Sequence, residues 1–195
     1  MLRAIGAPLT MFAICMAAPA VGQISNSHMV GNWYLATVHY GALGNSCVAK
    51  TTLADGTHLE LAMGDNGSYL KFELTNDDWV SLKDLPDVDS RGMRHIPISM
   101  IFNGTTETWA GTFEAIPKYT YNPVPLIRYG FEGDTTKEIL AAFSGASSLS
   151  VTSNGHSIGQ YPLVGSGAAV RDMVGCANAN RDARNFHEKN DPFRK

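Results

Sequence analysis

The sequence lacks the short motifs that mark common catalytic, metal and cofactor sites. It contains no C-x-x-C or H-x-x-x-H pair for zinc and no glycine-rich loop for a phosphate. The segment Gly165-Ser166-Gly167 lacks the G-x-S-x-G spacing of a hydrolase elbow, and Ser166 is better explained as the cap of a helix. We therefore predict no catalytic, cofactor-binding or metal-binding residue, and no cofactor.

Histidines and acidic residues leave weaker interpretations open. His39 and His58 fall on neighbouring predicted strands and could meet around a metal, although exposed strand positions explain both. The run Asp87–Gly92 imitates the start of a calcium loop, but Ile98 stands where an EF-hand carries its bidentate carboxylate. Two catalytic carboxylates meet in space rather than in sequence, so a hydrolase stays open as an alternative. Its candidate cluster is drawn from Asp77, Asp78, Asp84, Asp87 and His95.

Long apolar runs are confined to the start of the chain. A basic residue, Arg3, precedes the mostly apolar segment 4–16, and small residues follow up to Gly22. This layout is typical of a secretory signal peptide, here cleaved after Ala20 or Gly22. The apolar segment is short for a membrane anchor and is interrupted by Pro8. We therefore predict a signal peptide over 1–22 and a periplasmic or secreted mature protein without a transmembrane span.

Removal of residues 1–22 leaves 14 Lys and Arg against 18 Asp and Glu. The last segment, 178–195, is net basic, so the acidic charge lies on the body of the protein. An acidic body argues against nucleic acid as a partner, because binding there depends on neutralising phosphates. The last segment has no apolar periodicity and is predicted to be a disordered charged tail.

Cysteine is scarce: two remain after removal of the signal peptide, Cys47 and Cys176. An even count in an exported protein predicts one disulfide bond. Such a bond would close a very long loop and restrict the unfolded chain strongly. The alternative is two free thiols, one of them catalytic, but the sequence marks no histidine as the base that such a thiol needs.

Short alternating segments separated by turn residues predict one mainly β domain over 23–177. A first antiparallel meander with one wet face is followed by a strand whose Pro97 suggests a sheet edge or a bulge. The predicted strands are 33–40, 46–53, 57–63, 68–74, 93–102, 105–114 and 126–131, while 23–30 is predicted as a polar lead. Spacing of this kind favours an antiparallel β-sandwich or a flattened barrel.

The region from Asp134 to Cys176 predicts two short C-terminal helices around a hairpin. Asp134 and Gly145 can begin and end the first helix, and Asn154-Gly155 is a strong type I′ turn signal. Ser166 begins the second helix. The predicted core consists of Leu59, Leu61, Leu70, Phe72, Leu74, Leu149, Val151, Ile158, Val170 and Met173.

Several features together give the chain a resemblance to known proteins. They are Trp33, Cys47 at the opening of the meander, the segment Gln160–Ser166, and Cys176 after the last short helix. With these the chain resembles small exported proteins of alphaproteobacteria and, more weakly, the invasion-associated locus B family. The resemblance implies a periplasmic β-rich domain without established catalytic residues.

Aromatic side chains in or beside predicted loops supply the functional hypothesis. Trp79, Trp109, Tyr119 and Tyr121 are a candidate binding surface, although each could instead seal an end of the fold. The leading hypothesis is an exported, non-enzymatic module that binds an envelope or host protein. The alternatives are a small envelope hydrolase acting on glycan or peptide, and a structural accessory subunit of an envelope complex.

Overall fold

A computed structural model describes residues 22–40, 44–64, 67–79, 82, 94–105, 107–117 and 124–189. In this part of the chain, ten antiparallel strands form one sheet in the order β1-β2-β3-β4-β5-β8-β7-β6-β9-β10. The strands are β1 (Gln23–Val30), β2 (Trp33–His39), β3 (Asn45–Thr52), β4 (His58–Gly64), β5 (Tyr69–Thr75), β6 (Arg94–Asn103), β7 (Thr108–Ile116), β8 (Leu126–Glu132), β9 (Ser148–Ser153) and β10 (His156–Pro162). The helices are α1 (Asp134–Gly145) and α2 (Ser166–Lys189).

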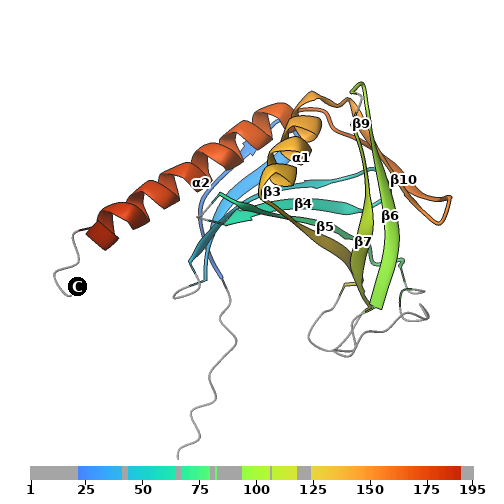
Figure 1. Ribbon diagram of the computed structural model, residues 1–195, viewed down its shortest axis with the longest axis horizontal. Helices are drawn as coiled ribbons and strands as arrows, with labels where there is room; N and C mark the ends of the chain where they lie inside the picture. Colours follow the sequence, from blue (N-terminus) through green and yellow to red (C-terminus); the bar gives the residue numbers. More distant parts are fainter. Residues whose placement is uncertain are drawn as a thin grey trace, which may run out of the picture.

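The predicted mainly β, antiparallel fold with two C-terminal helices is confirmed. The sheet is not closed, and it is divided by a short junction between β7 and β8. These strands pair at three positions only, Glu114 with Arg128, Ala115 with Ile127 and Ile116 with Leu126. We call β1 to β5 with β8 the long wing, and β7, β6, β9 and β10 the short wing. The two wings run in different directions in Figure 1, so the sheet approaches the predicted sandwich without being two separate sheets.

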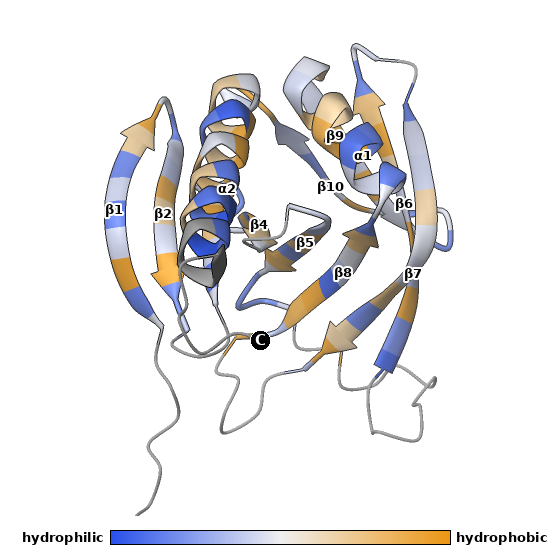
Figure 2. Cartoon of the chain, turned by 60° about the vertical axis from the view of Figure 1, so that its left-hand side comes forward, coloured by the Kyte–Doolittle hydropathy of each residue, from blue (hydrophilic) through white to orange (hydrophobic). Residues whose placement is uncertain are grey.

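The core lies between the inner faces of the wings and the two helices, which lie on the same side of the sheet (Figure 2). Phe72 of the long wing meets Phe113 of the short wing with ring centroids 5.8 Å apart. Phe143 of α1 packs 6.0 Å from Phe72 and 5.0 Å from Phe102 of β6. All predicted core residues are buried except Ile158, which is partly buried against the same core.

The pairing between strands corrects the prediction for residues 23–30 and explains the position of Pro97. Residues 23–30, predicted as a polar lead, form the edge strand β1, with a bulge between Ser25 and His28. Their alternation is hidden because Ile24 and Met29 face solvent, so no apolar face marks the strand. Pro97 lies where β6 pairs with β7 alone, because the pairing of β6 with β9 begins at Ser99. That position is locally an edge, which suits a residue without an N–H donor.

Helix α1 has the predicted bounds, but its start differs from the prediction. Asp134 lies inside the first turn, where it pairs with Lys137 at 2.8 Å, and Gly133 is the cap residue with φ 60°. The hydroxyl of Thr136 donates to the carbonyl of Phe131 at 2.9 Å and so ties the helix to β8. In the next hairpin Asn154 has φ 49° and Gly155 has φ 78°, as a type I′ turn requires.

Helix α2 begins at the predicted residue but is much longer than predicted. The hydroxyl of Ser166 donates to the carbonyl of Phe143 in α1, so it joins the two helices. The helix continues to Lys189, which corrects the prediction of a disordered tail for residues 178–189. Side chains 181–185 are exposed, so no apolar periodicity announces this part, while its Ala and Arg residues favour helix. Residues 190–195 and the predicted signal peptide, apart from Gly22, lie outside the described residues.

The described helices include none that combines the length and apolar character required to cross a membrane.

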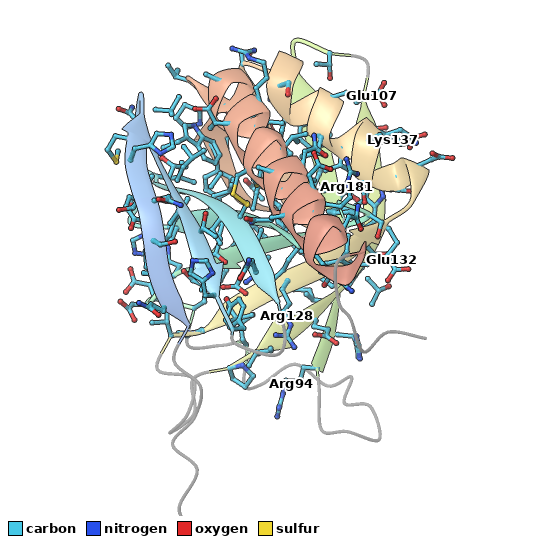
Figure 3. The ribbon with its side chains drawn as sticks, turned by 90° about the vertical axis from the view of Figure 1, so that its left-hand side faces the viewer. Arg94, Glu107, Arg128, Glu132, Lys137 and Arg181 are labelled. Carbon is cyan, nitrogen blue, oxygen red and sulfur yellow. A yellow bond between two sulfur atoms is a disulfide. The ribbon has the colours of Figure 1, made fainter. Side chains whose placement is uncertain are left out.

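Cys47 of β3 and Cys176 of α2 lie at disulfide distance, with Cα atoms 6.0 Å apart (Figure 3). The amide of Asn180 donates to the sulfur of Cys47 at 3.2 Å, and the hydroxyl of Thr37 lies 3.4 Å from the sulfur of Cys176. The pair therefore pins α2 to the long wing.

Replacement of Cys176 by Ser should lower the free energy of unfolding by about 2–5 kcal/mol, because the unfolded chain loses its longest covalent constraint. Urea denaturation of the wild type and of Cys176→Ser measures the difference. Wild-type protein kept under reducing agent is the matched control and should show the same loss. A non-reduced digest should yield linked peptides containing Cys47 and Cys176, and two alkylatable thiols in the native protein would contradict the bond.

Tyr161 of β10 is buried together with its hydroxyl. The residue is 1% exposed, and among the described residues Thr57 is the polar neighbour of its hydroxyl, without a hydrogen bond of regular geometry. Burial raises the pKa of Tyr161 to about 12; the nearby Thr57 opposes this rise, and the negative charge of Asp55 adds to it. An ordinary tyrosine in an unfolded chain has a pKa of about 10, so the folded state holds this proton more tightly.

The wild type should therefore lose stability relative to Tyr161→Phe as the pH rises from about 10. The contribution of the neutral hydroxyl is fully present below the unfolded pKa and is lost as the pH passes through the folded value of about 12. Thermal melts of both proteins across this window test it, and Tyr40→Phe, at an exposed tyrosine, is the control. Parallel curves for the wild type and Tyr161→Phe would show that the buried hydroxyl is not the cause.

Candidate functional site

A cleft of about 260 Å³ opens on the outer face of the sheet, where β7 and β8 separate. Four neighbouring strands line it, two from each wing. We call it the outer cleft, and its residues are Tyr69, His95, Thr112, Glu114, Arg128, Tyr129 and Gly130. Except for Tyr129, the strand pairing places these residues on the face opposite the helices. The outer cleft is therefore separated by the sheet from most of the core.

Tyr69 forms a flat platform at the long-wing side of the outer cleft. Its ring lies over the backbone of Gly130: a Cβ atom there would stand 2.6 Å from the Tyr69 hydroxyl oxygen and 2.8 Å from Cζ. Only glycine leaves room for the ring at this position, because real Cβ atoms do not approach so closely. Tyr69 is 40% exposed, so the sheet supports one side of the ring while the side chain stays open to solvent.

An ion pair forms the polar wall of the outer cleft. Nε of Arg128 donates to Oε2 of Glu114 at 2.7 Å, across the junction between the wings. Figure 3 shows Arg128 on this part of the sheet. Glu114 lies directly opposite His95 in the pairing of β7 with β6, and Glu73 lies opposite Arg128 in β5. A guanidinium carries five N–H donors in a fixed plane, so the bond to Glu114 orients the remaining ones.

On the side that faces the core, aromatic rings fill the space where β7 and β8 separate. Trp109 packs with its ring centroid 4.7 Å from Tyr129 and 5.0 Å from Phe131. The ring of Trp109 lies over Gly111, where a Cβ atom would overlap it. Tyr129 also contacts Phe113 at 5.1 Å. These contacts fill the space between β7 and β8 from within and give the outer cleft a rigid base.

The charges beside the outer cleft are also paired. Nζ of Lys71 lies 2.8 Å from Oε1 of Glu60 and 3.3 Å from Oε2 of Glu73. Burial disfavours the charge of Lys71, but the two carboxylates outweigh burial and raise the pKa of its ammonium group above the usual value. Glu60 and Glu73 face each other across β4 and β5, so Lys71 also relieves their repulsion.

The predicted aromatic surface is distributed differently in the structure. Trp109 belongs to the internal aromatic group, and Trp79 is partly buried against the core. Both side chains are only partly buried, so their role in binding stays a prediction. Tyr119 and Tyr121 lie outside the described residues. Tyr69, Glu114 and Arg128 were not among the predicted site residues, although the alternation of their strands places them on a solvent-exposed face.

The predicted acidic cluster is described only in part. Asp77 and Asp78 are exposed, and the amide N–H of Asp78 donates to Oδ1 of Asn76 at 2.8 Å in a local turn. His95 lies in the outer cleft. Asp84 and Asp87 fall outside the described residues, as does the whole run Asp87–Gly92 that imitates a calcium loop.

The two histidines considered for a metal do not meet. His39 bonds to Ser25 and Asn45 at one end of β3, whereas His58 bonds to Thr52 at the other end. Within the described ranges no group of three or more His, Cys, Asp or Glu side chains is arranged to hold a metal ion.

A second pocket, of about 250 Å³, lies between α2 and strands β1 to β3 and contains both cysteines. Its polar side chains reach across it: Nε2 of His28 lies 3.4 Å from Oδ2 of Asp172, and Asn180 donates to Cys47. These contacts join the edge strand and the disulfide to the helix. The pocket is thus explained by the docking of α2, whereas the outer cleft lies on the face of the sheet that the helices do not cover.

Comparisons with protein-family models, curated proteins and solved structures each give no match for this chain.

Proposed function

We propose that this protein is an exported, non-enzymatic binding module of the cell envelope or host interface, and that its ligand occupies the outer cleft. The observation that carries the proposal is the platform of Tyr69 on Gly130 beside the Arg128–Glu114 ion pair. An exposed aromatic side chain that rests on the backbone beside an ion pair is suited to recognition, because such contacts reduce the conformational freedom that is lost on binding. The paired charges and the aromatic base support the same rigid geometry.

A small envelope hydrolase is the second candidate, and one observation favours it. His95 and Glu114 are cross-strand neighbours in the outer cleft, where an acid–base pair would be useful. However, Arg128 bonds to one oxygen of Glu114 at 2.7 Å. This bond favours a fixed acceptor for recognition over a carboxyl group that transfers protons. The third candidate, a structural accessory subunit, would use a surface other than the outer cleft.

Export depends on the predicted signal peptide over 1–22. The apolar segment and the small residues before Gln23 support it, as does a cysteine pair at disulfide distance. Sequencing the N-terminus of the mature protein should give a start at Val21 or Gln23, in the periplasm or the medium. A cytoplasmic protein that retains residues 1–22 would contradict export.

Binding can be tested by sedimentation of the purified mature protein with isolated envelope fragments. We expect Tyr69→Ala and Arg128→Met each to weaken retention about tenfold, equivalent to about 1.4 kcal/mol. Tyr40→Ala is the matched control, because Tyr40 is 38% exposed, close to the 40% of Tyr69, and lies outside the outer cleft. Its retention should equal that of the wild type.

Other results would favour the other candidates. Equal retention of all three variants would place the contact elsewhere and favour an accessory subunit. Turnover of an envelope polymer by the wild type, abolished by Glu114→Gln, would favour the hydrolase. Melting temperatures of each variant identify any loss that comes from unfolding.

A further inference from the structure

We propose that the outer cleft binds one ring of a neutral saccharide, stacked on Tyr69 and hydrogen-bonded to the Arg128–Glu114 pair. This inference rests on the proposed binding function and specifies the ligand class. It follows from four properties of the described residues: the platform, the donor and acceptor set, the charge balance and the size of the cleft.

The platform suits the apolar side of a sugar ring. The face of an aromatic ring carries negative charge density and attracts the positively polarised hydrogens of C–H groups. A pyranose presents several such hydrogens on one side of its ring. Tyr69 offers this surface against the sheet, since its ring rests on Gly130 and a Cβ atom there would collide with Cζ at 2.8 Å. The ring therefore loses little freedom when the sugar stacks on it.

The polar wall suits the hydroxyl groups around the ring. Each sugar hydroxyl can donate one hydrogen bond and accept others, so it is best matched by a donor and an acceptor side by side. Arg128 and Glu114 supply that combination with their own separation fixed at 2.7 Å. The hydroxyl of Thr112, also in the cleft, can serve in either role. Both charged groups are oriented before the ligand arrives.

The charge balance favours a neutral ligand. Within the cleft the positive charge of Arg128 is matched by Glu114. An anionic group would approach the carboxylate of Glu114, and a cationic group would approach the guanidinium, so either is disfavoured by its nearest like charge. Beyond the cleft, Lys71 is held between Glu60 and Glu73 and offers no unpaired positive charge for a phosphate or carboxylate.

The size of the cleft separates a sugar from a protein partner. Its volume of about 260 Å³ lies just below the ~300–1,000 Å³ typical of pockets for drug-sized ligands, which suits a single ring of a longer chain. A stable protein–protein contact buries roughly 1,200–2,000 Å², far more than this cleft can supply. We therefore favour the saccharide, and a peptide or protein ligand becomes an outcome of the test.

The test is titration of the isotope-labelled mature protein with chitotriose, cellotriose and maltotriose, followed by NMR. At least one trisaccharide should shift the resonances of the outer cleft with a Kd of about 1 mM or below. Tyr69→Ala and Arg128→Met should each weaken that binding about tenfold, and Tyr40→Ala should leave it unchanged. Spectra and melting temperatures of the free variants establish that each is folded.

Gly130→Ala makes the test sharper, because it leaves every proposed contact group in the chain. Its new Cβ must lift the ring of Tyr69 from the sheet, so binding should fall about as far as in Tyr69→Ala. The double variant Tyr69→Ala/Gly130→Ala should bind no more weakly than either single variant, because both substitutions remove the same platform. Wild-type affinity in Gly130→Ala would overturn the stacking geometry.

Two measurements, trisaccharide binding and envelope retention, distinguish a wrong ligand class from a wrong binding function. If no trisaccharide binds at about 10 mM while envelope retention still depends on Tyr69 and Arg128, the cleft is a binding site and the saccharide is wrong. A peptide recovered from the envelope that shifts the same resonances would identify the ligand class as peptide instead. If envelope retention is also insensitive to both residues, the proposed function fails with it.

Discussion

Three residue pairs between β7 and β8 join the two wings of the sheet, and the shortness of this junction governs the rest of the structure. If the pairing continued, β7 and β8 would extend one continuous sheet. Instead the strands separate beyond Glu114 and Arg128, and large side chains fill the space that opens. Trp109 occupies it from the inner side, in contact with Tyr129 and Phe131.

Helix α1 accounts for the way the wings face each other. It follows β8 after a single turn at Gly133, whose φ of 60° reverses the chain toward the inner face. From there Phe143 reaches both Phe72 of the long wing and Phe102 of the short wing. Buried aromatic pairs contribute beyond their apolar area, by about 0.5–1.5 kcal/mol each. The helix therefore joins the wings on the inner side, and the short junction joins them within the sheet itself.

Local sequence patterns predicted the parts of this fold that depend on neighbours in the chain. Alternation placed Leu70, Phe72 and Leu74 in the core, and Asn154-Gly155 marked its hairpin, because period and turn chemistry act over a few residues. The order β5-β8-β7 could not be predicted in the same way. Strand β8 lies between two strands that precede it in the sequence, and no local signal encodes that insertion. The candidate site was missed for the same reason, because Tyr69, Glu114 and Arg128 come from three strands that neighbour each other only through this order.

Burial is the other property that the sequence did not reveal. Trp79 and Trp109 were given a binding role because aromatic type and proximity to a loop are visible in the sequence, whereas their packing against the core is not. The helical extension of α2 escaped prediction because an exposed helix needs no apolar stripe. In the sequence, by contrast, Tyr69 is only an aromatic residue on the solvent-exposed face of a strand. Its contact with Gly130 is visible only in the structure.

The alternation of a strand also separates the residues that stabilise the core from those that line the proposed binding site. Along β8, Ile127 and Phe131 are buried in the core, while Arg128 and Gly130 line the outer cleft. The two sets belong to one strand, so packing of the inner residues fixes the position of the outer ones. An outer residue can nevertheless be replaced without opening a cavity in the core. The inner face, closed by two helices and the Cys47–Cys176 pair, thus supports from behind the outer cleft in which we propose that a ligand binds.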